Sequence, residues 1–524
     1  MRRPFFFLVA ALLPLLLYAR TTTYGFVHGD DADLIAANQP FLRDLRNVPE
    51  AFARSYFDVE GELTSQKTYY RPVAIVSFML DATRAGADPR AYHLTNVALH
   101  AAATCLLLAL ALAWGAAPWA AFVAALVFAV HPVNVQAVAW IAGRNDLLLA
   151  AFGMTSLMAW HALGVGSWRL GIVAAHAATF ALALFSKETG LLVPVLALLH
   201  QRIVARASLT RAQWMALAVD ALVVAAWAAL RAAALGGQPP ELTVQSLQVG
   251  IGNLPQLLLH AGKMLAPIDL NVAPGVNTAG LLLGAAAVLL FARLVPGRLA
   301  AFGAVWVLAF LVPTLVVPGL PAYEHRAYLP LAGIALAGAQ IAKRRSDRRT
   351  ERQGDTPTQR PGPSLVWALS VCALWLCAFA ALTWQRQPVF RDAFAYWTDA
   401  VRDPQFGPMA NVNLGQLYEA EGRMPEARRE YLRALERNPN TPKAHNDLGV
   451  VLMKLDEPDL ALTHFREETR RHPWNADAWF NLGLFEETRG DAAAARRNYQ
   501  RAIEANPAYV PAYEKLGLTS PGPR

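Results

Sequence analysis

Residues 2–19 read RRPFFFLVAALLPLLLYA, in which two arginines precede an apolar run that starts at Phe5. About 20 mostly apolar residues form a helix that crosses a bilayer, so this run predicts a membrane span. The run leads shortly into Asp30 and Asp31. Carboxylates just beyond a span reach both water and the head group of a lipid-borne substrate, which makes this junction a candidate site.

The same run also has the composition of a secretory signal peptide. The segment Leu17-Tyr18-Ala19-Arg20 lacks the small-x-small pattern at which such peptides are cleaved. We therefore expect a retained first span.

Composition indicates an integral membrane protein with a soluble part. The chain has 524 residues, of which 55% are hydrophobic and 16% are charged, and the apolar residues fall in separate blocks. Many of the Lys and Arg residues behind the net charge of +8 lie in short loops beside these blocks. That distribution indicates membrane topology rather than a DNA-binding surface, so we expect no nucleic-acid partner.

The three cysteines indicate neither a disulfide nor a metal site. Each falls inside an apolar block, so the soluble parts contain no disulfide framework and no CxxC metal pair. They are Cys105, Cys372 and Cys377.

About eleven apolar segments of residues 1–386 are expected to cross the membrane. They lie near 4–20, 93–113, 118–135, 146–163, 168–186, 188–204, 213–234, 277–293, 299–317, 326–342 and 364–384.

Basic residues predict the orientation of these spans. The linker 343–360 is the most basic, and cytoplasmic loops carry an excess of Lys and Arg, so this linker and the N-terminus are expected on the cytoplasmic side. Residues 245–268 are apolar enough for a twelfth span, but counting them moves the basic linker outside, so we expect an interfacial or re-entrant helix there. The external loops then lie at 21–92, 131–145, 235–276 and 318–325.

The C-terminal part contains a repeat of 34 residues. Alanine recurs at this interval from Ala410, leucine from Leu414, glycine from Gly415 and proline from Pro439. This register is typical of the tetratricopeptide repeat, in which small residues let paired helices approach closely. We expect an all-α protein: a helix bundle, a connecting helix at 387–409, and an α-solenoid of three repeats and a truncated fourth at 410–524.

Polar residues in or beside the spans carry the remaining information, because a charge or imidazole there is costly unless it is paired or faces water. His93, Asn96 and His100 lie on one helix face. They fit either a cavity lining or hydrogen bonds between helices. An apolar helix is expected to break at His131-Pro132 and leave a polar shelf at the membrane edge.

Three charged clusters are expected on the same outer face. Arg144 and Asp146 fit either a salt bridge with each other or, for the arginine, a phosphate site. Lys187 and Glu188 fit either a self-neutralising turn or a site. The third cluster runs from Tyr323 to Pro330 and contains Glu324, Arg326 and Tyr328.

These motifs in this order, followed by the repeats, resemble the transmembrane-and-tetratricopeptide-repeat proteins, which are O-mannosyltransferases of the GT-C type. Two departures are Gln136, where the family typically carries Glu, and the short repeat array, which suggests a bacterial relative and leaves the acceptor open. The motifs are Asp30-Asp31, Tyr70-Arg71-Pro72, His93-x-x-Asn96-x-x-x-His100, Phe128-Ala129-Val130-His131-Pro132, Gly143-Arg144-x-Asp146, Ser186-Lys187-Glu188 and Arg326-Ala327-Tyr328-Leu329-Pro330.

The resemblance implies transfer of a sugar, in this family mannose, from a polyprenyl-phosphate donor to a hydroxyl on the extracytoplasmic face. The expected acceptor is a protein or peptide bound through the repeats. A carboxylate must accept the proton of that hydroxyl, and of the pair Asp30 and Asp31 we favour Asp31 as this base. The alternative for the pair is capping of the helix near Ala32. Adjacent carboxylates leave a divalent cation possible, and no other cofactor is expected.

The departing lipid phosphate needs positive charge or hydrogen-bond donors, for which the candidates are Arg144, Lys187, Arg326 and His131. The residues expected to line the cavity are Tyr70, Arg71, His93, Asn96, His100, Asp146, Glu188, Glu324 and Tyr328.

Two other classes of function stay open. One is a multi-pass anchor that displays a repeat scaffold, although an anchor gains nothing from intramembrane polar residues. The other is a transporter of a lipid-linked sugar, which typically shows symmetry between halves of the membrane part. In each case we expect a bacterial inner-membrane protein with a cytoplasmic N-terminus and periplasmic repeats.

Overall fold

Every regular element in the described part of the chain is a helix, which confirms the predicted all-α class. The chain forms two compact units, residues 1–272 with 276–392 and residues 273–275 with 393–524. The computed structural model describes residues 2–27, 29–57, 69–166, 170–236, 244–267, 270–272, 275–295, 297–316, 323–352 and 363–519.

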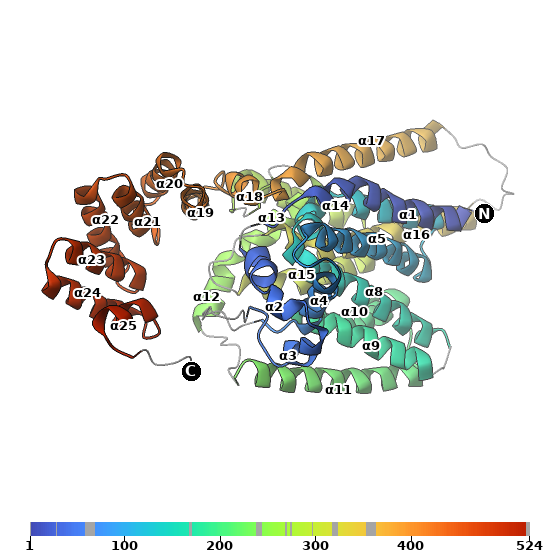
Figure 1. Ribbon diagram of the computed structural model, residues 1–524. Helices are drawn as coiled ribbons and strands as arrows, with labels where there is room; N and C mark the ends of the chain where they lie inside the picture. Colours follow the sequence, from blue (N-terminus) through green and yellow to red (C-terminus); the bar gives the residue numbers. More distant parts are fainter. Residues whose placement is uncertain are drawn as a thin grey trace. The chain divides into compact units, whose positions relative to one another are not determined.

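Long helices run lengthwise through the first unit (Figure 1). They are α1 (Arg2–Tyr18), α5 (Pro89–Ala113), α6 (Pro118–Val130), α8 (Arg144–Gly164), α9 (Leu170–Ser186), α11 (Arg211–Ala234), α14 (Thr278–Leu294), α15 (Gly297–Leu315), α16 (Tyr328–Arg352) and α17 (Pro363–Arg386). Between them lie shorter α-helices: α2 (Gln39–Leu42), α3 (Val48–Ala51), α4 (Pro72–Ala85), α7 (Val135–Ala139), α10 (Leu192–Leu199), α12 (Val244–Asn253) and α13 (Pro255–Leu265).

Short 3-10 or π turns link these helices and carry several of the candidate site residues. They are η1 (Ala19–Thr23), η2 (Ala32–Ala36), η3 (Leu45–Asn47), η4 (Pro132–Asn134), η5 (Ile141–Gly143), η6 (Glu188–Leu191), η7 (His200–Ala205), η8 (Glu324–Ala327) and η9 (Gln387–Phe390).

All eleven segments predicted as spans contain a helix, but they differ in length. Within the described ranges, six helices are long and apolar enough to cross a membrane, and a seventh span results if α6 and the helical segment after it count as one. Two further helices, α9 and α14, are apolar but have 17 residues each. The protein is therefore a multi-pass membrane protein, and eleven crossings stay a prediction.

The expected break at His131 is present. The axis bends by 50° between Pro118–Val130 and Pro132–Ala139. Proline has no backbone N–H to continue the helix, and the His131 side chain instead accepts the N–H of Val133 at 3.2 Å. The break lies inside the unit, where protein groups rather than lipid satisfy the freed backbone.

The segment 245–268 forms two helices rather than one span. Helix α12 has 10 residues and α13 has 11, with Pro255 at the start of the second. Each is too short to cross a bilayer alone. The predicted external loop 21–92 is also folded, since it contains α4 and several short turns; its residues 58–68, like residues 353–360 of the basic linker, lie outside the described residues.

Helices α1 and α5 run antiparallel. The Tyr18 ring at the end of α1 lies 5.3 Å from the His100 ring, and Cys105, later in α5, lies 3.8 Å from the carbonyl of Phe7, earlier in α1. The ring of Tyr24, which follows the η1 turn after α1, lies 6.2 Å from that of His93, earlier in α5. The start of α1 and the end of α5 at Trp114 therefore lie at one end of the bundle, whereas His93 lies toward the other.

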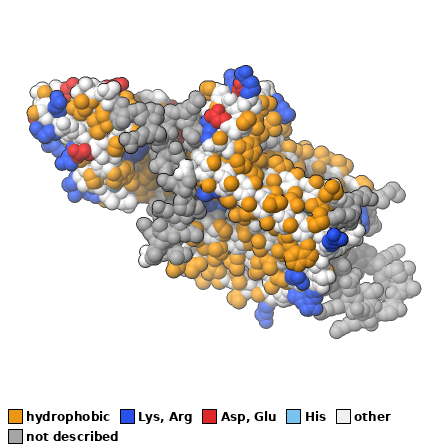
Figure 2. Space-filling view, turned by 90° about the horizontal axis from the view of Figure 1, so that it is seen from below, with side chains coloured by type: hydrophobic (Ala, Val, Ile, Leu, Met, Phe, Trp, Pro, Cys, Tyr) orange, Lys and Arg blue, Asp and Glu red, His pale blue; other side chains and the backbone are white. Residues whose placement is uncertain are grey.

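The outside of this unit is apolar, as a lipid-facing surface must be. Figure 2 shows a broad face of hydrophobic side chains, with Lys and Arg mainly near its edges. Leu222 of α11, Leu289 of α14 and Leu374 of α17 are among the apolar side chains that remain exposed.

The second unit consists of helix pairs. After α18 (Ala393–Ala400) these are α19 (Gly407–Ala420) with α20 (Met424–Arg437), α21 (Ala444–Lys454) with α22 (Pro458–Arg471), α23 (Ala476–Thr488) with α24 (Ala492–Ala505), and the single α25 (Val510–Leu516).

The periodic glycines explain why the paired helices lie so close. A Cβ built on Gly449 would stand 2.6 Å from the Phe465 ring, and one built on Gly415 would stand 2.5 Å from the Tyr431 ring. Each ring comes from the second helix of the pair and packs directly against the backbone of the first helix. Only a residue without a side chain leaves room for the ring at that position. The predicted tetratricopeptide architecture is confirmed.

We predict that Gly449→Ala destabilises the repeat unit by about 1–3 kcal/mol, because the added methyl group forces the Phe465 ring to move within a packed core. Thermal unfolding of the purified full chain, followed by circular dichroism, measures this. The matched control is Gly338→Ala, where nothing lies within 4 Å of the added Cβ. Equal unfolding curves for the two variants would contradict the packing explanation.

Candidate functional site

The two aspartates after α1 have different surroundings. Asp31 is fully buried, and its carboxylate accepts the N–H of Ala142 at 2.9 Å and that of Val27 at 3.1 Å. Asp31 stands at the N-cap position of the η2 turn that starts at Ala32, but its side chain makes no hydrogen bond to the backbone of that turn. Asp30 is half-buried, so part of it remains accessible.

Burial raises the pKa of both carboxyl groups. The pKa of Asp30 rises to about 6, with Arg71 acting in the opposite direction, and that of Asp31 rises to about 7 despite its two N–H donors. A carboxylate with a pKa close to neutral is suited to accept a proton during catalysis. Of the pair, Asp30 combines such a pKa with access.

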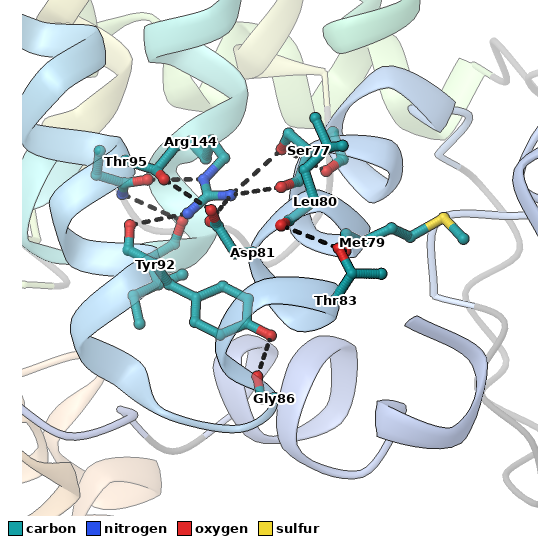
Figure 3. Close-up of polar contacts among 12 residues, drawn as sticks. Ser77, Met79, Leu80, Asp81, Thr83, Gly86, Tyr92, Thr95 and Arg144 are labelled. Atoms are coloured by element: carbon teal, nitrogen blue, oxygen red, sulfur yellow. Dashed lines mark hydrogen bonds and ion pairs between the residues drawn. The ribbon is translucent and has the colours of Figure 1, made fainter. Parts of the chain in front are cut away.

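Arg144 lies at the centre of a buried polar network (Figure 3). One guanidinium nitrogen lies 2.6 Å from the Asp81 carboxylate, Nε donates to Asn96 Oδ1 at 2.8 Å and Nη2 donates to the Tyr92 carbonyl at 2.8 Å. Thr95 donates to the other Asp81 oxygen at 2.8 Å. Because Arg144 is fully buried and spends its donors on protein acceptors, the structure favours a positioning role over the expected phosphate contact.

Asn96 extends this network to the turn before α8. Its Nδ2 lies 3.1 Å from the Trp140 carbonyl and 3.3 Å from those of Val138 and Ile141. The next residue of the turn, Ala142, donates to Asp31. The network of Arg144 thus fixes the backbone that holds the aspartate pair.

The two histidines of α5 also serve the fold. His100 bonds the Tyr328 hydroxyl at 2.8 Å through Nδ1 and the Ala129 carbonyl at 3.1 Å through Nε2. His93 Nε2 lies 3.3 Å from the Gly25 carbonyl. The sequence left open whether these histidines line a cavity or form hydrogen bonds between helices. For His100 the contacts favour hydrogen bonds between helices. The contact of His93 joins α5 to the segment that precedes the aspartates.

Residues at the helix break join distant segments. His131 is fully buried, and its Nε2 bonds the Met264 carbonyl at 3.1 Å. Gln136 donates to the Val272 carbonyl at 3.2 Å and accepts the N–H of His325 at 3.0 Å. An amide both donates and accepts here, which an ionised Glu cannot do.

Two ion pairs lie near the start of α8 and the end of α9. Lys187 Nζ stands 2.7 Å from Asp146, and Arg71 Nε stands 3.0 Å from Glu188. Glu188 also accepts the N–H of Tyr70 at 3.0 Å. Neither local pairing considered from the sequence, Arg144 with Asp146 or Lys187 with Glu188, is the one that forms.

Glu324 is the carboxylate of a third buried group. It is fully buried, lies 3.0 Å from Lys263 Nζ and accepts the N–H of Asn271 at 2.8 Å. Arg386 approaches its second oxygen at 3.6 Å. Glu324 therefore holds α13 and the end of α17 to the η8 turn, rather than lining an open site.

Arg326 differs from the other cations of the site. Its guanidinium lies over the Tyr323 ring, 5.4 Å from the centroid, and no described carboxylate lies within ion-pair distance. Its Nη1 is buried and has no hydrogen-bond partner among the described residues, and the same holds for Nδ1 of His325. The guanidinium of Arg326 keeps its charge, because an arginine side chain is not deprotonated in proteins.

Five charged or ionisable groups at this end of the bundle influence one another electrostatically, and Arg326 also lies over the Tyr323 ring. Arg71 lowers the pKa of Asp30, Asp30 raises that of Tyr323, and Arg71 and Arg326 both add to the effect of burial in lowering that of Lys187. We call Asp30, Arg71, Lys187, Tyr323 and Arg326 the acid–cation cluster.

A metal site is not evident in the described ranges, where no three His, Cys, Asp or Glu side chains are grouped to hold an ion. Sequence reasoning also missed two residues. Asp81 is the single acid in the apolar segment PVAIVSFMLDATRA of α4, and Lys263 lies in the segment whose membrane position was ambiguous. A lone charge in an apolar stretch was the available signal for both.

Fold and site define a multi-pass helical membrane protein with a tetratricopeptide-repeat unit and an acid–cation cluster at one end of its bundle. Two repeat models match the chain, "Tetratricopeptide repeat" over residues 446–510 and "TPR repeat" over residues 415–456.

Among the known protein sequences that are similar to parts of this chain are protein O-mannosyl-transferases. The chain is 34% identical over 151 residues to TMTC2 of Mus musculus, which covers 29% of this chain and 18% of that protein. It is 29% identical over 212 residues to TMTC4 of Homo sapiens, which covers 36% and 28%. The matches thus span less than a third of these relatives. Over these stretches the chain is similar to the transmembrane-and-tetratricopeptide-repeat proteins, and the resemblance predicted from its motifs is confirmed.

Two solved membrane enzymes resemble the chain distantly. The oligosaccharyltransferase of Archaeoglobus fulgidus is 13% identical with a TM-score of 0.47, over 86% of this chain and 68% of that chain. ArnT from Cupriavidus metallidurans, bound to undecaprenyl phosphate, is 13% identical with a TM-score of 0.40, over 91% and 80%.

We predict that Arg144→Ala destabilises the membrane unit by about 3–5 kcal/mol, because it leaves the Asp81 carboxylate buried without a counter-charge. The double variant Arg144→Met with Asp81→Leu removes both charges and should recover most of this loss. Thermal unfolding in detergent measures both. An Arg144→Ala protein as stable as wild type would show that the pair is not structural.

Proposed function

We propose that this protein is a membrane glycosyltransferase that moves a sugar, mannose in the first instance, from a polyprenyl phosphate to a hydroxyl of a protein acceptor. The observation that carries the proposal is Arg326, a cation with no carboxylate partner among the described residues, in one cluster with the accessible Asp30. A transferase of this kind needs a base for the acceptor and a positive charge for the leaving phosphate.

Asp30 is the base in this proposal. The acceptor oxygen attacks the anomeric carbon while Asp30 takes its proton, and the bond from that carbon to the phosphate oxygen breaks. Although the sequence favoured Asp31, that carboxylate is fully buried and each of its oxygens accepts a backbone N–H, whereas Asp30 is partly exposed. Asp31 then positions its neighbour.

Arg326 receives the departing phosphate. When the bond breaks, its electron pair stays on the phosphate, whose extra charge a guanidinium stabilises through two parallel N–H groups. Lys187 is paired with Asp146, and Arg71 is paired with Glu188. Both cations therefore act on the phosphate through their electrostatic field rather than by direct contact. Nδ1 of His325, which has no hydrogen-bond partner among the residues that the structure describes, supplies a further contact on the same turn.

An apolar cavity supports a lipid-linked donor. It has a volume of about 550 Å³ and lies among helices α13, α14, α15 and α16, with Leu258, Met264, Phe291, Leu308 and Ile341 in its wall. Helix α16 begins directly after the η8 turn that carries Arg326. An isoprenoid chain in this cavity would leave its phosphate toward that turn.

A polar ladder on the repeat unit supports a peptide acceptor. Gln416 of α19 donates to Asp447 of α21 at 2.9 Å, and Asn481 of α23 donates to Asn446 of α21 at 2.9 Å. Amide side chains on successive helices suit the backbone of an extended peptide. The orientation predicted from the basic residues, with bacterial inner membrane and periplasmic repeats, belongs to the same proposal.

We predict that Asp30→Asn lowers sugar transfer by about 10²–10⁴-fold, because an amide cannot accept the acceptor proton. Transfer of a radiolabelled sugar from polyprenyl-phosphate mannose to protein in membranes measures this. In the wild type the rate should rise as pH increases through about 6, where Asp30 loses its proton, and then level off.

The comparison variant for this experiment is Asp31→Asn. Its amide can accept only one of the two N–H groups that the carboxylate accepts, so under the proposal it loses part of the activity but retains more than Asp30→Asn. Full activity of Asp30→Asn would exclude it as the base. Loss of activity in Asp31→Asn alone would restore the assignment made from the sequence.

We predict that Arg326→Met raises the KM for the polyprenyl-phosphate sugar and lowers kcat, because the buried charge that meets the phosphate is removed. Initial rates at varied donor concentration measure both constants. Arg46→Met, on an exposed arginine paired with Asp44, is the matched control and should leave them unchanged. Unchanged constants in Arg326→Met would place the phosphate elsewhere.

A further inference from the structure

A second pocket lies at the end of the bundle opposite to the acid–cation cluster. It has a volume of about 410 Å³ and is lined by residues that include Trp114, His161, Val165, His200, Gln201 and Gln340. Helix α5 connects the two ends, with Tyr92 beside Arg144 near its start and Trp114 directly after its last residue. Its 25 residues span about 37 Å at 1.5 Å per residue, so the two sites are separate.

Two buried side chains in this pocket lack partners. His200 is 6% exposed and Gln340 is 8% exposed, and Nε2 of each has no hydrogen bond within the described part of the chain. The amide nitrogen of Gln340 can only donate, and Nε2 of His200 donates in one tautomer. Buried polar atoms are nearly always paired, so these two call for an acceptor from outside the protein.

The wall of the pocket is rigid around these atoms. Trp114 stacks on His200 with ring centroids 3.7 Å apart and an angle of 14°, and Phe302 lies on His200 at 5.6 Å. Gln201 donates to the Ser208 carbonyl at 3.3 Å and so closes the adjoining turn. The imidazole is therefore held in place before any ligand arrives.

Two arginines lie beside the lining residues in the sequence. Arg202 and Arg206 are exposed and flank the lining residues Val204 and Ala205. Val165, also in the lining, is 70% exposed. This combination fits a ligand with a negative head and an apolar body.

We propose that this pocket binds the phosphodiester head group of an anionic membrane lipid in the leaflet opposite to the acid–cation cluster. The phosphate oxygens accept from Gln340 and His200, the two neighbouring arginines balance the charge, and the acyl chains lie against the apolar surface of the bundle. A lipid is favoured over free phosphate because the exposed Val165 places apolar surface at the mouth. The proposal does not depend on the transferase function.

Binding of phosphatidylglycerol to the purified, delipidated full chain, titrated and followed by native mass spectrometry, tests this. His200→Phe with Gln340→Leu removes both donors but keeps the ring stack and the volume, and it should weaken binding at least tenfold. Gln405→Leu with His464→Phe makes the same chemical changes on the repeat unit and should leave the affinity unchanged. Val165→Trp, which narrows the mouth without touching the buried residues, should also weaken binding.

Diacylglycerol and inorganic phosphate distinguish the source of the phosphate. Under the proposal, diacylglycerol does not bind at this site, and inorganic phosphate at the same concentration does not displace phosphatidylglycerol. Displacement by inorganic phosphate would overturn the lipid and leave a free-anion site. Equal lipid binding by the double variant, the Val165→Trp variant and wild type would overturn the site itself.

Discussion

The buried ion pair between Arg144 and Asp81 is the interaction on which the rest of the site depends. Removing a guanidinium and a carboxylate from water is costly unless the two are paired, and here they lie 2.6 Å apart across helices α4 and α8. The same guanidinium fixes the Asn96 amide, which in turn binds three carbonyls of the turn before α8. Ala142, in that turn, donates to Asp31. A chain of directed contacts therefore runs from the bundle interior to the aspartate pair.

The presence or absence of a carboxylate partner also distinguishes the cations near the acid–cation cluster that stabilise the fold from the one that can bind a ligand. Lys187 and Arg71 have carboxylate partners within hydrogen-bond distance, so they stiffen the site and supply a positive field. Arg326 has none among the described residues and rests on an aromatic ring instead. A site with a rigid, positively charged surround and one unpaired guanidinium is preorganised for an anion, and the half-buried Asp30 gives it a base.

Much of the fold is readable from the sequence, whereas the pairing of charges is not. The length of the apolar runs predicted the helices, and the proline after His131 predicted the bend. The glycines at intervals of 34 residues, Gly449 among them, predicted the repeats. Each of these signals is local in the sequence. The partner of Arg144 is Asp81, far away in the chain, and only the packing of α4 against α8 brings them together. Arg144 and Arg326 therefore looked alike in sequence, although Arg144 has a carboxylate partner and Arg326 has none within the described part of the chain.

Photocrosslinking tests most directly whether the acid–cation cluster holds a lipid phosphate. A polyprenyl phosphate with a photoactivatable group beside the phosphate would be irradiated with the purified chain, and the labelled peptides would be mapped by mass spectrometry. The account predicts adducts on the η8 turn around Arg326 and on the neighbouring α13, lost when unlabelled polyprenyl phosphate is added in excess. Adducts spread over the outer apolar helices, or unaffected by the competitor, would contradict it.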